Sequence, residues 1–344
     1  MSERQLARLS APLPLSWLIR LSGERVYRPM YHTVAGDYPL PHVEHLYTPH
    51  PLERFVRDLD FLLRRFDPIG LDELPSALAG ERRGRRPALL LTFDDGLREI
   101  HDVALPVLRA KGVPAAIFVN SAFVGNGGLF FRYLASALVA RAEASAPSAA
   151  LSAELVGTLR GSGADAGERQ DTDWRRALLG VRYADRARLD VAAALLEFDV
   201  TAFLDAQRPF LTVEQLRHLR SEGFAIGAHS VDHPLYRELS LDEQIEQTSA
   251  SCEYVRRTFA QSDCTFAFPF SDVGVSGAFF ERVRDESIAS ALFGGQGYRV
   301  ERFPEVVQRH SMEGREGSVE QLVRADHAMS LARRATGRYR VERG

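Results

Sequence analysis

The stretch PALLLTFDDG, from Pro87 to Gly96, constrains the fold more than any other part of the chain. Its apolar run is too short for a capped core helix and is typical of a strand buried on both faces. The run stops at Asp94 and Asp95, whose side chains can share one cavity only if the backbone leaves the strand there, which Gly96 permits. Because two ionised carboxylates at such a place need a cation or a shared proton, we predict a metal-and-base site.

The composition limits the classes of protein to which the chain can belong. Its 344 residues are enough for one catalytic domain with additional segments. Lys and Arg number 43 against 46 Asp and Glu, and no basic stripe with interleaved aromatic residues is present, so we expect no nucleic-acid partner. The two cysteines, Cys252 and Cys264, have no C-x-x-C spacing and suggest neither a disulfide framework nor a thiolate zinc cluster, which fits a reducing compartment.

An apolar run from Leu13 to Leu21 lies near the N-terminus, and Pro14 and Arg20 interrupt it. The run is too short to span a bilayer and lacks a small-residue cleavage site, so we expect a cytoplasmic protein. Trp17 and its apolar neighbours beside basic residues would allow peripheral contact with a membrane surface. Docking of this segment on its own domain is the arrangement that we expect.

Strands and helices are predicted to alternate along the chain. Apolar runs predict strands at 26–34, 68–71, 88–93, 113–120, 224–228, 265–269, 289–293 and 306–307. Helical spacing of apolar residues predicts helices at 51–66, 72–79, 104–111, 130–142, 149–159, 174–179, 187–198, 212–221, 241–259, 277–284 and 319–331. This alternation, with polar residues at strand ends, is the pattern of a (β/α) barrel or of a doubly wound sheet.

Residues 126–206 interrupt the alternation with helical segments and a predicted loop at 161–167. This segment is too long for an ordinary crossover, so we interpret it as a helical insertion between 1–125 and 207–344, which form the main domain. We expect the insertion to lie beside the ends of the strands and to select the acceptor. Its apolar cluster, Phe130, Phe131, Tyr133 and Leu134, is expected to pack in a core rather than to hold a lipid. Since neither predicted ligands nor sheet come from the insertion, its removal is expected to leave metal binding intact.

The second motif, HSVDH, places His229 and His233 four residues apart directly after a predicted strand. Residues four apart lie on the same side of a helical turn, so both imidazoles can reach one ion. Pro234 disfavours a long helix at this place, and we therefore expect a single turn in a loop. Two imidazoles and one carboxylate are a sound ligand set for Zn²⁺ or a similar divalent ion.

Each motif has a plainer interpretation when it is taken alone. Asp94 could cap the following helix while Asp95 is solvated in its first turn. The two histidines could be core residues or a chance spacing. Two such signals, both at strand ends, rarely coincide, so we favour the metal site.

Together, TFDDG at 92–96 and HSVDH at 229–233 resemble the first two motifs of the NodB-type polysaccharide deacetylases, carbohydrate esterase family 4. The segments VYRPMYHTV, GVPAAIFVN and FAFPF are also similar to segments of that family. The resemblance implies a distorted (β/α) barrel of the polysaccharide deacetylase type, here with a helical insertion. It also implies that Asp94 is the general base and that Asp95, His229 and His233 bind one divalent ion, with Zn²⁺ as the expected ion.

The chain departs from the family pattern in its later motifs. The third family motif usually has an arginine two residues before its proline and a tyrosine after it. Here the proline is Pro269, so Ala267 occupies the arginine position and Phe270 the tyrosine position. Both Pro269 and Phe270 are expected beside the substrate, with a backbone N–H of Phe270 near the oxyanion. The Asp-and-Trp motif is not visible.

The general acid is the least determined part of the site. The fifth family motif, Leu-x-His, is matched only at His310, which makes this residue a candidate for the acid. A surface histidine beyond a strand is the alternative. His32 is the second candidate, because it lies at the end of a predicted strand and is expected on the same rim.

These features predict a metal-dependent hydrolase that removes an N-acyl group, with acetyl as the first expectation, from an amino sugar of a polysaccharide or its precursor. The divalent ion would acidify water and polarise the acyl oxygen, and a carboxylate would take the proton. One rival is hydrolysis of a formamide or of a non-sugar amide at the same site. Another is a degenerate barrel that binds glycan without turning it over, since the expected arginine and tryptophan are missing.

Overall fold

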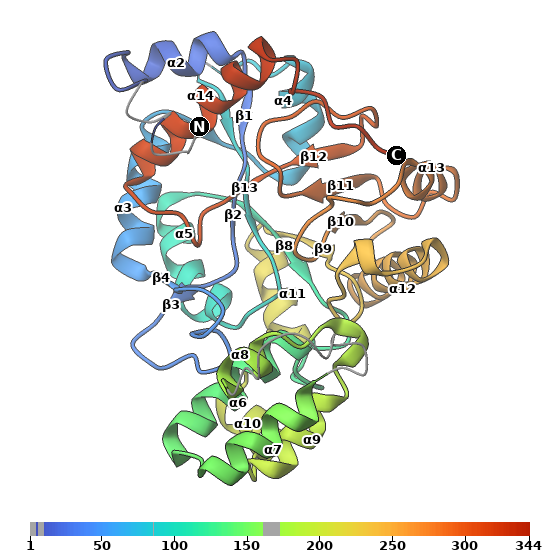
Figure 1. The fold of residues 1–344 in the computed structure, drawn as a ribbon. Coiled ribbons are helices and arrows are strands. Elements are labelled where there is room, and N and C mark those ends of the chain that lie inside the picture. Colours follow the sequence, from blue (N-terminus) through green and yellow to red (C-terminus); the bar gives the residue numbers. More distant parts are fainter. Residues whose placement is uncertain (1–4, 6–9, 85, 161–172) are drawn as a thin grey trace.

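The structure is a computed structural model that describes residue 5 and residues 10–84, 86–160 and 173–344, so the predicted loop at 161–167 lies outside it. Its centre is a nearly closed sheet of parallel strands in the spatial order β12-β11-β10-β9-β8-β7-β2-β13 (Figure 1). These strands are β2 (Pro29–Tyr31), β7 (Leu91–Phe93), β8 (Ala115–Val119), β9 (Ala225–Ala228), β10 (Thr265–Ala267), β11 (Ala291–Gly294), β12 (Val306–Gln308) and β13 (His310–Ser311). The prediction of a (β/α) barrel rather than a doubly wound sheet is confirmed.

One continuous segment of the chain supplies both strands at the edges of the nearly closed sheet. Strand β12 pairs with β11, strand β13 pairs with β2, and only Arg309 separates β12 from β13. The sequence predicted β12 but not β13, because two residues give no periodicity. Arg309 is therefore placed at the seam of the barrel, next to the first strand of the ring.

Two smaller sheets extend the barrel. Strands β1 (Val26–Tyr27), β6 (Ala88–Leu89) and β5 (Asp67–Pro68) form a three-stranded sheet, and β3 (Val34–Ala35) pairs with β4 (His50–Pro51). The predicted strands at 26–34 and 88–93 are each divided between sheets. The first run breaks after Tyr27 and the second at Leu90, whose N–H donates to the Tyr27 carbonyl at 2.9 Å.

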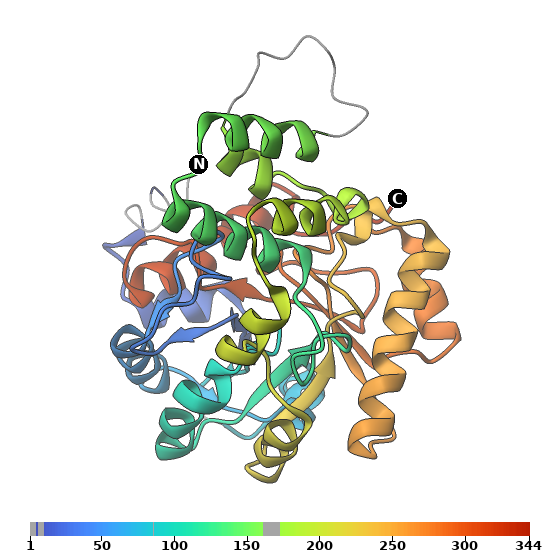
Figure 2. The ribbon, with the colours of Figure 1, turned by 90° about the horizontal axis from the view of Figure 1, so that it is seen from below.

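Helices surround the sheet, as Figure 2 shows from the end of the molecule that carries the insertion. They are α2 (Leu15–Ser22), α3 (Leu52–Leu63), α4 (Leu74–Ala79), α5 (Leu105–Lys111), α11 (Val213–Ser221), α12 (Leu241–Phe259), α13 (Gly277–Asp285) and α14 (Val319–Ala335). A π-helical turn, Ile100–Ala104, precedes α5, and three-residue 3₁₀ turns lie at Leu71–Glu73, Tyr183–Asp185 and Tyr236–Glu238. The apolar faces of these helices pack in the main core, except that Leu74 and Ala77 of α4 belong to a separate cluster with Phe118 and Phe293.

Helix α2 docks on the barrel as expected, because Leu15, Leu18 and Ile19 are buried in the main core. Within the described ranges, every helix is too short or too polar to cross a bilayer. The cytoplasmic location stays a prediction.

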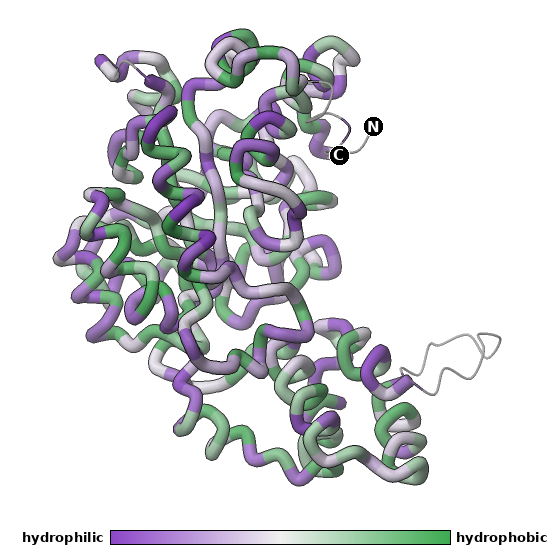
Figure 3. The backbone as a smooth tube through the Cα atoms, turned by 90° about the vertical axis from the view of Figure 1, so that its left-hand side faces the viewer, coloured by the Kyte–Doolittle hydropathy of each residue, from purple (hydrophilic) through white to green (hydrophobic). Residues whose placement is uncertain are grey.

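The segment after β8 is helical and lies at one end of the barrel, at the bottom of Figure 1. It consists of α6 (Phe131–Ser145), α7 (Ala149–Leu159), α8 (Trp174–Leu179), α9 (Arg188–Leu195) and α10 (Val200–Gln207). Hydrophobic and hydrophilic residues alternate along these helices in Figure 3, and their apolar residues form a second core with the loop around Leu40 and Val43. Phe130, Phe131, Tyr133 and Leu134 are buried in this core. Core packing was the expected role of this cluster.

Candidate metal and catalytic site

The two carboxylates of the first motif lie at the carboxyl end of β7, and the histidines of the second follow β9, so parallel strands bring them to one rim. The backbone leaves the strand at Asp95, which has φ of 67°, and at Gly96, which has φ of 66°. A Cβ added to Gly96 would lie 2.9 Å from Val119 Cγ1, so this turn requires glycine for space as well as for conformation. The turn lets both carboxylates face one cavity, as the sequence required.

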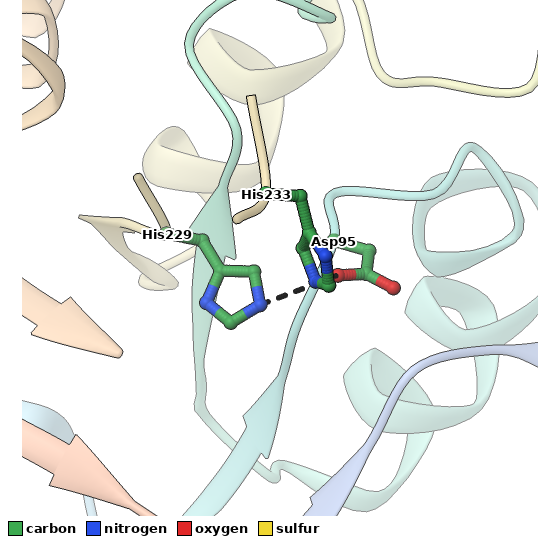
Figure 4. Close-up of side chains that lie close together, drawn as sticks. All are labelled: Asp95, His229 and His233. Carbon is green, nitrogen blue, oxygen red and sulfur yellow. Dashed lines mark ion pairs between the residues drawn. The ribbon is translucent and has the colours of Figure 1, made fainter. Parts of the chain in front are cut away.

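Asp95, His229 and His233 form one compact, buried group (Figure 4). Asp95 Oδ1 lies 3.3 Å from His229 Nε2 and 3.1 Å from His233 Nε2. Their ligand atoms lie within 4.8 Å of one another, and Asp95 Oδ1 is buried with no hydrogen-bond partner among the described residues. Asp94 and Asp95 are only 2% and 3% exposed, so the alternative of a helix cap and a solvated first-turn residue is wrong.

Local hydrogen bonds aim the imidazoles at this point. The Nδ1–H of His229 donates to the Ala267 carbonyl at 2.8 Å, which leaves the lone pair of Nε2 facing Asp95. The backbone N–H of His233 donates to Ser230 Oγ at 3.0 Å within a turn where Ser230 and His233 both have positive φ, of 70° and 64°. Such backbone strain is frequent at functional sites.

Burial and charge favour the protonation states that bind a cation. Burial lowers the pKa of His233, so the imidazole is held neutral. Burial opposes ionisation of Asp95, but His233 and His229 outweigh it and hold its pKa well below the usual range. A neutral imidazole and an ionised carboxylate are the forms that bind a divalent ion.

Asp94 is held by Arg309, which the sequence analysis did not identify. Arg309 Nη1 donates to Asp94 Oδ1 and Nη2 to Asp94 Oδ2, both at 2.7 Å, in a bidentate pair. Arg309 is 1% exposed, and its guanidinium also donates to Thr92 Oγ1 at 3.1 Å. Burial opposes ionisation of Asp94, but the charge of Arg309 lowers its pKa below the usual range.

Arg309 supplies the charge partner that the sequence lacks at Ala267. Its guanidinium lies over the rings of Phe118 and Phe293, at 5.2 and 5.7 Å from their centres. Ala267 belongs to the same interior cluster as these rings, so a small residue there leaves room for the guanidinium. One sequence signal could have found it: an arginine inside the apolar strand run VVQRH must be paired when it is buried.

The insertion supports the metal ligands directly. Tyr133 O–H donates to Asp95 Oδ2 at 2.6 Å, and the ring of Phe130 stacks on His233 with centres 4.3 Å apart. Asp232, inside the second motif, accepts hydrogen bonds from Tyr183 of the insertion at 2.7 and 2.8 Å. Removal of the insertion would take away both contacts with the ligands, so these contacts argue against the expectation that metal binding stays intact, which remains a prediction.

The carboxylates open into a cavity of about 350 Å³ that His32 also lines. His32 Nδ1 lies 3.2 Å from Glu313 Oε2, and Glu313 Oε1 accepts the backbone N–H of His32 at 2.6 Å. Burial lowers the pKa of His32, but the charge and hydrogen bond of Glu313 outweigh it and raise the pKa to about 9. A protonated imidazole therefore faces the same cavity as Asp94 and Asp95.

His310, the first candidate for the general acid, does not line this cavity. Its ring packs on Tyr27 and Tyr298, and its Nδ1 lies 3.2 Å from Asp326 Oδ1 on α14. The side chain points to the outer face of β13, whereas Arg309 and Ser311 on either side of it line the cavity. This geometry contradicts the placement of His310 beside the reacting bond, and of the two candidates His32 has the position that an acid requires.

The two third-motif residues, Pro269 and Phe270, differ in their relation to the cavity. Phe270 lines the cavity, is 48% exposed, and its ring meets the His233 ring edge-on with centres 4.5 Å apart. Pro269 is buried directly before it and does not line the cavity itself. Phe270 has φ of 57°, which is a further residue in the left-handed region at this rim.

A family model described as polysaccharide deacetylase matches residues 81–165 and 191–279, which is about half of the chain and includes both motifs. The chain belongs to the polysaccharide deacetylase family. It is thus a hydrolase of carbon–nitrogen amide bonds. No curated protein matches the sequence.

Solved structures of polysaccharide deacetylases share the fold. The structure of IcaB from Ammonifex degensii aligns with a TM-score of 0.53 at 16% identity, covering 89% of this chain and 98% of that one. The Streptococcus pyogenes deacetylase PplD in complex with acetate aligns with a TM-score of 0.53 at 14% identity, covering 88% and 97%. The expected fold class, a distorted (β/α) barrel of the polysaccharide deacetylase type with a helical insertion, is confirmed.

Proposed function

We propose that this polysaccharide deacetylase removes an N-acyl group, with acetyl as the first expectation, from an amino sugar of a polysaccharide or its precursor, and that the reaction depends on one divalent metal ion. The observation that carries the proposal is one cavity that Asp95 and His233 of the buried Asp–His–His group line together with the arginine-paired Asp94 and the protonated His32. One structural relative, PplD, was solved in complex with acetate, which supports acetyl as the acyl group.

The protein residues fit a divalent ion. Asp95, His229 and His233 would hold it, since the orphaned Asp95 Oδ1 and two Nε2 atoms converge on one point. Two nitrogens and one oxygen suit Zn²⁺, which is the ion that we propose. A bound ion supplies Lewis-acid chemistry there, polarising the acyl oxygen and lowering the pKa of water.

Asp94 would act as the base. It takes a proton from the attacking water as the new carbon–oxygen bond forms at the acyl carbon. Arg309 keeps the carboxylate ionised and fixes both of its oxygens. The backbone N–H of Phe270 would hold the developing oxyanion, as the resemblance implies.

His32 would act as the acid. With a pKa of about 9 it carries its proton at neutral pH, and it gives this proton to the amine nitrogen as the carbon–nitrogen bond breaks. The products are a carboxylate, acetate for an acetyl group, and the free amino sugar. Glu313 then holds His32 in place for the return of a proton from solvent.

The test combines metal analysis with a screen of N-acetylated and N-formylated oligosaccharides for released acid. We expect about one divalent ion per chain, acetate release, and loss of activity in Asp94→Asn with the ion retained. Asp232→Asn is the matched control, because Asp232 belongs to the second motif but binds Tyr183 rather than the ligand group. Absence of a stoichiometric ion, or full activity of Asp94→Asn, would refute the proposal.

The rivals give different results in the same screen. Release of formate without acetate would identify a deformylase, and glycan binding without any product would identify a degenerate barrel. The bidentate pair between Arg309 and Asp94 argues against the degenerate barrel, because it replaces the charge partner whose absence suggested it.

A further inference from the structure

A second cavity, of about 610 Å³, lies at the end of the barrel opposite the insertion, and no step of the proposed hydrolysis uses it. Residues of α2 and α4 line it together with the segment that leads into β6. Figure 1 shows α2 and α4 at the top of the molecule, and the insertion that covers the catalytic rim at the bottom.

The cavity is strongly basic. Six arginines line it: Arg20, Arg25, Arg64, Arg65, Arg82 and Arg86. The nearby carboxylates are largely engaged, because Asp67 pairs with Arg82 at 3.3 Å and with Arg86 at 2.6 Å. Glu24 accepts hydrogen bonds from Ser330 at 2.6 Å and from Arg334 at 3.1 Å, both on α14.

The other four arginines form no ion pair with any residue that the structure describes. Arg25 donates to the Leu78 carbonyl at 3.0 Å, and Arg65 donates to the Phe61 carbonyl at 3.5 Å. Arg20 and Arg64 are exposed. This excess of positive charge on one face attracts anions from solution.

Exposed apolar side chains lie on or next to α2 and α4, the two helices that also line the cavity. Trp17 and Leu21, on α2, are 65% and 59% exposed, and Leu13, directly before the helix, is 42% exposed. Trp17 and Leu21 lie four residues apart and form an apolar stripe on the helix, while the buried side chains of Leu15, Leu18 and Ile19 anchor the helix in the core. Leu78 of α4, beside Arg25, is 36% exposed.

We propose that this face docks on an anionic lipid bilayer. Arginines bind phosphate groups of lipids, and a tryptophan with leucines on the same face enters the interface between headgroups and acyl chains. A soluble anion would fill the cavity but leave the apolar stripe in water. A second copy of the chain in a twofold arrangement would bring the two arginine clusters face to face, which repulsion opposes.

Docking on this face gives the molecule a fixed orientation. The catalytic rim and the insertion lie at the far end of the barrel, so they point away from the lipid surface (Figure 1). The docking surface and the catalytic pocket share no lining residue, so each can be altered without the other.

The experiment uses the full chain and two kinds of vesicle, phosphatidylglycerol with phosphatidylcholine and phosphatidylcholine alone. Trp174→Phe leaves Trp17 as the single tryptophan, whose emission should shift to the blue with anionic vesicles only. In co-sedimentation, Trp17→Ser with Leu21→Ser, and separately Arg64→Glu with Arg65→Glu, should each weaken binding by at least about tenfold. Val191→Ser, 52% exposed on α9, and Arg257→Glu, exposed on α12, are the matched controls and should bind like the wild type.

Three results would overturn the proposal. They are no binding of the wild type to anionic vesicles at low salt, equal binding of the wild type to both kinds of vesicle, and a loss of vesicle binding in the control variants as large as in the variants of the docking face. Concentration-dependent dimerisation that Trp17→Ser abolishes, without vesicle binding, would assign the face to a second copy instead. Thermal unfolding of each variant shows that the changes leave the fold intact.

Discussion

Two histidine–carboxylate pairs lie on opposite sides of β13 and have nearly the same geometry. His32 Nδ1 lies 3.2 Å from Glu313 Oε2, and His310 Nδ1 lies 3.2 Å from Asp326 Oδ1. His32 of the first pair lines the catalytic cavity together with Asp94. The second is enclosed between the sheet and α14, against the rings of two tyrosines. The two regions differ in access to the cavity rather than in the chemistry of the pair.

The two regions also contain similar arginine–carboxylate pairs that differ in their access to the cavity. Arg309 pairs with Asp94 at 2.7 Å on the cavity side, and Arg315 pairs with Asp326 at 2.5 Å on the helix side. Burial and charge pairing therefore do not identify a catalytic group. The alternation of side chains along the strand decides which pair meets the substrate, so a one-residue shift of register would exchange their roles.

Replacement of His32 and of His310 by alanine should give the largest difference in kcat between the two regions. His32→Ala should lower kcat by about 10²- to 10⁴-fold with the metal retained, because the leaving amine loses its proton donor. His310→Ala should keep kcat per folded molecule and lower the melting temperature, since it leaves the charge of Asp326 less well compensated. Kinetics, metal content and thermal unfolding check this comparison. Equal losses of kcat in the two variants would show that the regions are coupled.

Replacement of Arg309 and of Arg315 by methionine should give the second-largest difference, which is a difference in the pH dependence of the rate. Arg309→Met removes one partner of a pair that is 1% and 3% exposed, which should cost about 3–5 kcal/mol of stability. Burial then raises the pKa of Asp94, so the base becomes protonated at higher pH and the acid limb of the rate profile moves upward. In the wild type the low pKa of Asp94 contributes stability above its unfolded pKa, and this contribution is lost as pH falls through the folded value.

Arg315→Met is the matched control, because its partner Asp326 lies outside the cavity. It should lower the melting temperature without moving the acid limb. An acid limb that moves in Arg315→Met, or stays fixed in Arg309→Met, would contradict the assignment of Asp94 as the base.

The sequence predicted the parts of the site that lie within short motifs. The barrel, the strand-end position of Asp94 and Asp95, and the histidines after β9 follow from a few neighbouring residues each. Arg309 lies 215 residues from Asp94 along the chain, and its role depends on how the last strand closes the barrel. No periodicity carries that information, and the match of His310 to a family position pointed to a side chain that pairs with Asp326 and does not line the cavity.

The insertion shows a second limit of prediction. Its helices follow from apolar spacing, and α7 and α8 have the predicted bounds. The hydrogen bond from Tyr133 to Asp95 depends on how the insertion packs against the rim, which sequence periodicity does not determine. A tyrosine inside an apolar cluster was therefore interpreted as core packing alone, although it has both roles.

Removal of a tyrosine hydroxyl in each region should give a smaller difference, which is a difference in metal affinity. Tyr133→Phe removes the hydrogen bond to Asp95 Oδ2 and should weaken metal affinity by about 10- to 100-fold. Tyr298→Phe is the control, because Tyr298 packs on His310 and its hydroxyl has no hydrogen-bond partner among the described residues. Titration with a competing chelator measures both. Equal affinities would show that the insertion holds Asp95 by packing only.

The smallest expected effect is that of Glu313→Gln, which should shift the alkaline limb of the pH–rate profile with little change in the maximum rate. The protonated form of His32 is required, so the wild-type rate should fall as pH rises through about 9. Besides Glu313, the charged groups that raise this pKa are Asp95 and Asp94. Glu313→Gln keeps an oxygen for the backbone N–H of His32 but removes the largest opposing charge. Burial then lowers the pKa, and the alkaline limb should move toward neutral pH.

The free energy of unfolding should also decrease as pH rises through the folded pKa of His32. A folded pKa of about 9, above the ordinary 6.5, contributes stability that is complete below pH 6.5 and is lost as pH rises through about 9. Glu313→Gln should flatten this decline, whereas Asp326→Asn, on the other side of β13, should leave the alkaline limb where it is. A pH profile of kcat/KM and unfolding curves at several pH values measure both effects. If Asp326→Asn moved the alkaline limb and Glu313→Gln did not, the acid would be His310, and the comparison of the two regions would have to be reversed.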